Sequence, residues 1–125
     1  FMYIIGPVRG LPKDEVKSNF EKAEKLAIDL GYIPFNPLKI VPLWLTDLED
    51  QVTGARRVIL DLLTSKLLHS HAVLIQYDSE KSSGARIEMK IAEEEKIPTF
   101  YLDSTNSKVH FIQKYEHRDK SAVED

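Results

Sequence analysis

The chain has 125 residues, 42% of them hydrophobic and 30% charged, with a net charge of −3, which is the composition of one soluble globular domain. The charge balance predicts no nucleic-acid binding, no apolar run approaches the roughly 20 residues that span a bilayer, and residues 1–5 lack the basic region of a signal peptide. Because cysteine is absent, disulfides, thiolate zinc sites and a cysteine nucleophile are excluded, and a reducing, cytoplasmic location is expected.

The first third of the chain predicts a strand, a long helix and a second strand. Residues 2–5 are a continuous apolar run ended by Gly6, which is typical of a strand buried on both faces of a parallel sheet. Over residues 12–30 apolar side chains recur at helical spacing, and Gly31 follows as a stop, so this range is predicted to be a helix. Residues 32–35 predict a short second strand.

The remainder of the chain continues the alternation. Residues 38–50 predict an irregular segment, and residues 53–68 predict a helix with an apolar stripe. Residues 72–75 are apolar without alternation, which indicates a central strand. A third helix is predicted over 83–95 and a last strand over 97–102.

This order predicts a single α/β domain over residues 1–102. Regular alternation favours a three-layer sandwich in which helices cover both faces of a parallel sheet of four or five strands, as in flavodoxin-like and Rossmann-like folds. Residues 103–125 are polar and charged. We therefore expect a C-terminal extension that is partly disordered, with a short docked element around 109–115.

Two glycine-containing segments follow predicted strands at the place where such folds bind ligands. In an open parallel sheet, ligands bind outside the carboxyl ends of the strands. Residues 6–10 follow the first strand, and residues 82–88 follow the third. If those two strands are neighbours, the two segments face each other.

The first segment has the features of an anion site. Gly6 and Gly10 allow a close backbone approach or a positive φ, the following helix start presents N–H groups, and Arg9 adds a fork of donors. An ordinary strand-to-helix turn with an exposed arginine explains the same residues equally well. The segment matches neither a Walker A motif nor a dinucleotide fingerprint.

The second segment joins small polar residues to an acid. Ser82, Ser83 and Gly84 could cradle a phosphate at a helix start, and Glu88 lies about one turn inside that helix. Serine is also a favoured N-cap and an early acid complements the helix dipole, so taken alone the segment is better explained as a cap. His69 and His71 have no third ligand, so no metal site is predicted.

Together the two segments resemble a known family. The run from Tyr3 to Gly10 before an amphipathic helix, and the pattern Ser82-x-Gly84-x-x-x-Glu88 after the third strand, resemble the nucleoside 2-deoxyribosyltransferase superfamily. Within it, the closest patterns are those of the 2′-deoxynucleoside 5′-phosphate N-hydrolases and of a bacterial and phage group described as deoxyribosyltransferase-like. The resemblance spans residues 2–102.

The resemblance implies cleavage of the N-glycosidic bond of a deoxynucleoside 5′-monophosphate, by hydrolysis or by transfer of the deoxyribosyl group. Glu88 would be the nucleophile on C1′ in a retaining mechanism, and Tyr3 would orient it. The residues that match phosphate-binding positions are Gly6, Arg9, Gly10, Ser82 and Gly84. Serine at position 82 favours a phosphate, because an acid there would repel one. No metal or organic cofactor is implied.

The sequence also departs from the family pattern. Pro7 replaces a serine that holds the phosphate, and the aspartate of the second helix falls at Leu63. Asp61 is two residues away, about 200° round a helix. A non-catalytic module that binds or senses a nucleotide is therefore the alternative reading. The resemblance also implies a homodimer or larger homo-oligomer, for which 41–48 and 58–68 are the candidate interface.

Overall fold

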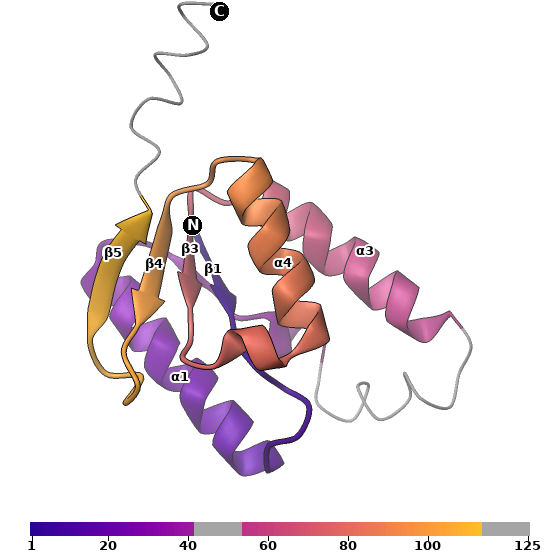
Figure 1. Cartoon of the computed structure of the whole chain (residues 1–125), viewed down its shortest axis with the longest axis horizontal. Coiled ribbons are helices and arrows are strands. Elements are labelled where there is room, and N and C mark those ends of the chain that lie inside the picture. Colours follow the sequence, from indigo (N-terminus) through magenta and orange to yellow (C-terminus); the bar gives the residue numbers. More distant parts are fainter. Residues whose placement is uncertain (42–53, 114–125) are drawn as a thin grey trace, which may run out of the picture.

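The computed structural model describes residues 1–41 and 54–113, without the side chains of 55, 56 and 111–113, and contains one five-stranded sheet (Figure 1). The strand order is β2-β1-β3-β4-β5. The first four strands pair in parallel, and β5 runs antiparallel to β4. The strands are β1 (Met2–Ile5), β2 (Pro34–Phe35), β3 (Ala72–Ile75), β4 (Thr99–Leu102) and β5 (Val109–Gln113).

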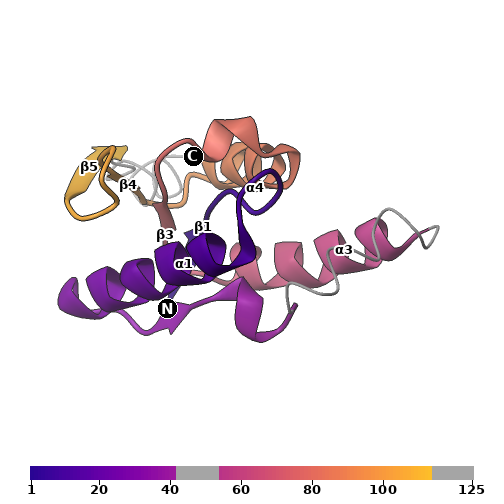
Figure 2. The ribbon, with the colours of Figure 1, turned by 90° about the horizontal axis from the view of Figure 1, so that it is seen from below.

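Helices cover both faces of the sheet, as the composition of the two cores shows (Figure 2). Helix α1 (Lys13–Asp29) packs on one face, and α3 (Ala55–Leu68) and α4 (Ser83–Glu94) pack on the other. Short 3-10 helices follow β2 and β3, namely η1 (Pro37–Lys39) and η2 (Ser79–Lys81). Among the described residues, no helix is both long and apolar enough to cross a membrane.

The two central strands explain why the sequence forms three layers. All four residues of β1 and all four of β3 are buried. Successive side chains of a strand point to opposite faces, so Met2 and Ile4 join the α1 core, whereas Tyr3 and Ile5 join the core under α3 and α4. A strand without polar alternation is therefore stable only between two helical layers.

The predicted α/β fold, its central strand and its three long helices are confirmed. The second strand is shorter than expected, since pairing with β1 begins only at Pro34 and Ile33 is 77% exposed. The fifth strand comes from the segment expected to be an extension, where a docked element was predicted. The expectations for residues 42–50 and for the tail beyond His117 lie outside the described residues.

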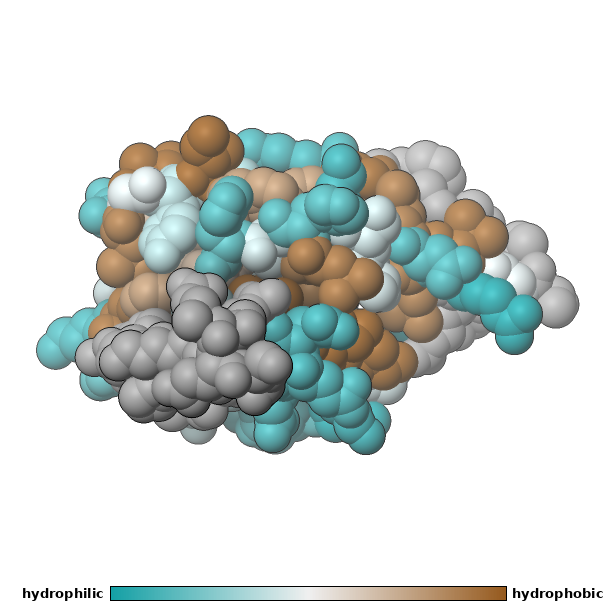
Figure 3. Space-filling model, turned by 90° about the horizontal axis from the view of Figure 1, so that it is seen from above, coloured by the Kyte–Doolittle hydropathy of each residue, from teal (hydrophilic) through white to brown (hydrophobic). Residues whose placement is uncertain are grey.

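The two edges of the sheet differ in character. At the carboxyl edge, the register Ile5↔Ile75 brings the segments that follow β1 and β3 together, as predicted. Figure 3 shows the opposite edge, where hydrophobic side chains reach the surface. Exposed apolar residues lie where α1 and α3 end and just before β2, at Ile28, Ile33 and Leu68. The carboxyl edge, by contrast, is where glycines and polar side chains meet.

Candidate functional site

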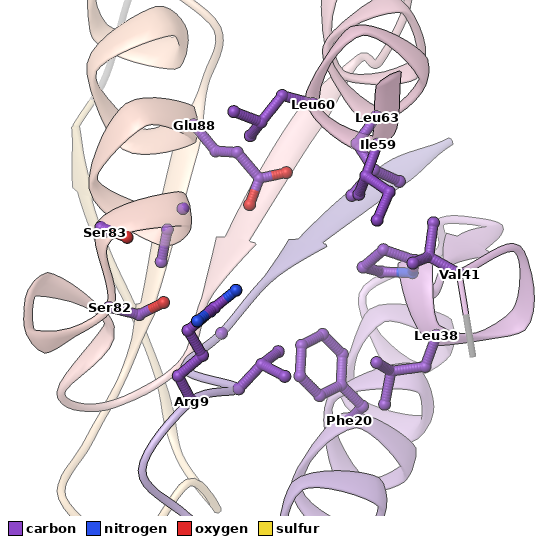
Figure 4. A pocket seen from close by; sticks show the side chains of 15 residues that line it. Arg9, Phe20, Leu38, Val41, Ile59, Leu60, Leu63, Ser82, Ser83 and Glu88 are labelled. Atoms are coloured by element: carbon purple, nitrogen blue, oxygen red, sulfur yellow. The ribbon is translucent and has the colours of Figure 1, made fainter. Parts of the chain in front are cut away.

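A cavity of about 100 Å³ lies at the carboxyl edge of the sheet, beside the end of β1 (Figure 4). Its lining comes from five places in the chain: the loop after β1, α1, η1, α3 and the start of α4. Of the sequence-predicted residues, those that line it are Gly6, Arg9, Ser82, Ser83, Gly84 and Glu88. The fold therefore brings the two glycine-containing segments into one site.

The acid of the site is Glu88, on the second turn of α4. Its side chain points into the cavity (Figure 4) although the residue is only 8% exposed. The hydroxyl of Tyr3, in β1, donates a hydrogen bond to Glu88 Oε2. Strand alternation turns Tyr3 toward the α4 side of the sheet, and Phe35 stacks on its ring at 5.2 Å between centroids. A buried phenol thus fixes the orientation of a buried carboxyl group.

Burial controls the protonation of this pair. It raises the pKa of Glu88 from 4.5 to about 7, while the hydrogen bond from Tyr3 acts in the opposite direction. Burial also raises the pKa of the Tyr3 hydroxyl, and the neighbouring Glu88 charge raises it further. Tyr3 is therefore a permanent proton donor to Glu88, whereas Glu88 itself changes charge near neutral pH.

The start of α4 provides the polar end of the cavity. Ser82 precedes the helix with extended backbone angles, and its side chain makes no capping hydrogen bond. The first N–H groups of a helix have no partner within it, and they carry the positive end of the helix dipole. A Cβ at Gly84 would meet nothing within 4 Å, so the glycine leaves open space beside these groups. Arg9 reaches the cavity from the loop after β1 (Figure 4).

The opposite wall of the cavity is apolar. Helix α3 contributes three side chains, and four more come from α1, η1 and the neighbouring loops (Figure 4). They are Val8, Phe20, Leu38, Val41, Ile59, Leu60 and Leu63. Leu63 thus occupies the position where the resemblance places an aspartate. Asp61 is exposed and is not among the lining residues, so within the described lining Glu88 is the one carboxylate.

Comparison with known proteins places the chain in a family. Residues 1–101 match the family described as Domain of unknown function (DUF4406). The chain belongs to this family. Neither the curated proteins nor the solved structures gave a match. The matched range of this DUF4406 domain contains every residue of the site described above, from Tyr3 to Glu88.

Two residues of the first segment of the DUF4406 domain lie elsewhere. Gly10, predicted to hold phosphate, lines a neighbouring cavity on the α1 side together with Pro7, and it does not line the cavity of Glu88. Its φ of +85° is a conformation that side chains rarely adopt, so this glycine is required by the turn. Arg9 lies between them in sequence and lines both cavities.

Sequence reasoning missed the packing of Gln76 on Gly6. A Cβ at Gly6 would lie 2.2 Å from Gln76 Nε2, so any larger residue there would force the buried amide of Gln76 to shift. Gln76 is 2% exposed, and neither polar atom of its amide has a hydrogen-bond partner among the described residues. The available signal was a polar residue directly after the apolar run of β3, but only the structure shows its neighbour.

The described residues contain no group of three or more His, Asp or Glu side chains that could hold a metal ion. The two histidines near β3, His69 and His71, each have a hydrogen-bond partner of their own. His69 Nδ1 lies 2.7 Å from the carbonyl oxygen of Ser65, inside the last turn of α3. The polar groups that the described lining brings to the cavity are the carboxyl group of Glu88, the hydroxyls of Ser82 and Ser83, the guanidinium of Arg9 and backbone N–H groups.

Proposed function

We propose that this protein cleaves the N-glycosidic bond of a deoxynucleoside 5′-monophosphate, with Glu88 as the nucleophile. One observation carries the proposal: Glu88, which accepts a hydrogen bond from the buried Tyr3, lies on the wall of a cavity whose other polar groups suit an anion. A buried acid that faces a cavity and is held by a second buried group is the arrangement expected of a reacting carboxylate.

In the first step, an ionised oxygen of Glu88 attacks C1′ of the sugar. The bond from C1′ to the base nitrogen breaks, and the base leaves with the electron pair and takes up a proton from solvent. In the second step, water attacks C1′ of the glycosyl ester, gives deoxyribose 5-phosphate and a proton, and restores the carboxylate. A second base in place of water would give transfer. Tyr3 holds Glu88 in line throughout.

The polar end of the cavity supplies the site for the 5′-phosphate. The N-terminal N–H groups of α4, the hydroxyl of Ser82 and the guanidinium of Arg9 all favour an anion. The open space at Gly84 allows the phosphate to approach the backbone. The apolar side chains of α1, η1 and α3 would then surround the sugar and base.

A second candidate function is binding of the same nucleotide without catalysis. The apolar wall favours it, because Leu63 and the neighbouring Ile59 and Leu60 offer no proton to a leaving base. A general acid for the leaving group contributes roughly 10² to 10⁴ in rate. Without one, only bases that leave readily would be released at a useful rate.

The experiment is to measure free base by chromatography after incubation with a panel of deoxynucleoside 5′-monophosphates. Wild type is compared with Glu88→Gln and with Glu94→Gln, a control on the exposed part of the same helix. The proposal predicts release by wild type and Glu94→Gln, and none by Glu88→Gln. If all three proteins release nothing but are stabilised against heat by the nucleotides, the second candidate is correct.

A further inference from the structure

A second cavity opens at the same edge of the sheet, on the α1 side, and its volume is about 580 Å³. Its lining comes from the loop after β1, the first turns of α1, the turn after β3 and the loop between β4 and β5. Arg9 lines this cavity and the cavity of Glu88. The second cavity is therefore the neighbour of the proposed active site and is several times larger.

One wall of the second cavity is a preorganised loop. Asp103 Oδ1 accepts hydrogen bonds from the backbone N–H groups of Thr105 at 3.2 Å, Ser107 at 3.1 Å and Lys108 at 3.2 Å. It also accepts one from the hydroxyl of Thr105 at 2.8 Å. These bonds hold the β4–β5 loop in the shape that presents Ser104, Thr105 and Asn106 to the cavity.

The same loop is joined to the turn after β3. The backbone N–H of Tyr77 donates to Asn106 Oδ1 at 2.9 Å. Asn106 and Asp78, on the two sides of this contact, have positive φ values of 55° and 61°. Left-handed conformations at residues other than glycine are uncommon and are retained where the surroundings fix them. Two separate connections thus form one continuous polar surface.

The charges of the second cavity balance. Lys81 Nζ lies 3.2 Å from Asp78 Oδ2, so each neutralises the other. Arg9 and Glu15 add one positive and one negative side chain. A phosphate would meet as many carboxylates as cations here, unlike at the start of α4. This balance gives an anion no advantage, so a ligand without net charge fits the cavity best.

We propose that the second cavity binds a neutral nucleoside or free nucleobase. Tyr77 lines it and is 46% exposed, which leaves aromatic surface on which a planar ring can stack. Asn19 carries a carboxamide whose paired donor and acceptor match the edge of a base, and the Nδ2 group of Asn106, whose Oδ1 holds the Tyr77 N–H, adds a further donor. This inference goes beyond glycosidic cleavage and does not depend on it.

The experiment is a titration of the ¹⁵N-labelled full chain with thymidine and adenosine, followed by backbone amide resonances. The proposal predicts that the nucleosides shift the resonances of Tyr77, Thr105 and Asn106, and that inorganic phosphate does not shift these three. If nucleosides shift none of them at millimolar concentration, or if phosphate shifts them as much, the proposal is wrong.

Variants test which groups make the contact. Tyr77→Ala is expected to weaken nucleoside binding about tenfold, whereas Tyr77→Phe, which keeps the ring, binds as wild type. Asn19→Ala is expected to weaken it severalfold without risk to the fold, because alanine favours the helix in which Asn19 lies. Wild-type affinity in both alanine variants would overturn the proposal. Glu88→Gln leaves these shifts in place even if the proposed cleavage fails, so the two proposals fail separately.

Discussion

Helices α3 and α4 lie on the same face of the sheet and line the same cavity, yet they contribute opposite chemistry. Helix α4 and the preceding Ser82 bring Ser82, Gly84 and Glu88 to the cavity, whereas α3 brings Ile59, Leu60 and Leu63. The buried residues of α4 are Ala85, Glu88 and Ala92, so a single carboxyl group interrupts a small-residue packing face.

The two walls of the cavity differ in role: the α4 wall carries the carboxyl group, and the α3 wall sets the shape of the cavity. An acid buried between two alanines is stable only with a partner, and Tyr3 supplies that partner from β1. The α3 side chains that line the cavity have no polar group that could hydrogen-bond to Glu88 or protonate a leaving group. In the proposed reaction, bond cleavage would fall to the α4 side and exclusion of water to the α3 side.

The largest expected effect is on the rate of base release, which a substitution in the α4 wall should lower far more than one in the α3 wall. Glu88→Gln should lower the rate of base release by at least about a thousandfold, because the amide cannot form the glycosyl ester. Leu63→Ala enlarges the cavity without touching the carboxyl group, and should change kcat/KM by less than about tenfold. Steady-state kinetics on both variants measure the two losses of kcat/KM. An equal loss in the two variants would show that the α3 and α4 walls do not differ in role.

The next effect is on stability, and it follows from the pKa of Glu88. Folding raises this pKa from 4.5 to about 7, so the folded chain binds the proton more tightly than the unfolded chain. The contribution of Glu88 to the free energy of unfolding is therefore greatest below pH 4.5 and declines as pH rises through 7, by roughly 3 kcal/mol.

Glu88→Gln lacks this titration. Between pH 5 and pH 8, its free energy of unfolding should rise relative to wild type by about 2 to 3 kcal/mol. Urea unfolding at both pH values measures the difference, and Glu94→Gln serves as the exposed control on the same helix. A difference that stays constant with pH would mean that Glu88 has an ordinary pKa and that its burial does not matter.

A smaller effect concerns the floor of the cavity, at the end of β1. Gly6→Ala should destabilise the fold by about 1 to 3 kcal/mol, because the new Cβ would lie 2.2 Å from Gln76 Nε2. Gly84→Ala, whose Cβ meets nothing within 4 Å, should not destabilise it. Chemical unfolding of the two variants gives the comparison, and adding Gln76→Ala to Gly6→Ala should recover part of the loss. No recovery in that double variant would show that the clash is elsewhere.

The smallest effect tests the role of Tyr3 as a positioning residue. Tyr3→Phe removes the hydrogen bond that lowers the pKa of Glu88, so the ionised form appears at higher pH. We expect about a tenfold loss at pH 7, and an ascending limb of the pH–rate profile that moves to higher pH. A loss of the same size at every pH would indicate a packing defect instead.

Much of the fold follows from patterns that the sequence carries locally. The apolar runs at residues 2–5 and 72–75 have no polar alternation, and a strand of this kind is stable only between two helical layers. Parallel pairing of these two strands then places the segments after Gly6 and after Gln76 at one edge. Counting positions along the second predicted helix also identified Leu63 as the residue at the place of the family's aspartate, and Leu63 lines the cavity.

Other features depend on packing between distant residues and could not be read from local patterns in the sequence. Tyr3 and Glu88 are 85 positions apart, and only the resemblance, not their spacing or surroundings, predicted that they interact. The steric constraint on position 6 arises from Gln76, 70 residues later, and not from the φ of Gly6. The separation of Gly10 from Gly6 into two cavities depends on the direction of a loop, which glycine leaves free.

The most direct test of the central claim is to trap the intermediate on Glu88. A deoxynucleoside 5′-monophosphate that wild type cleaves is mixed with the protein, the reaction is quenched with acid, and the digested chain is analysed by mass spectrometry. We predict one added deoxyribosyl 5-phosphate on the peptide that contains Glu88, and no addition in Glu88→Gln. Release of base with the adduct on another residue, or undiminished release by Glu88→Gln, would contradict the account.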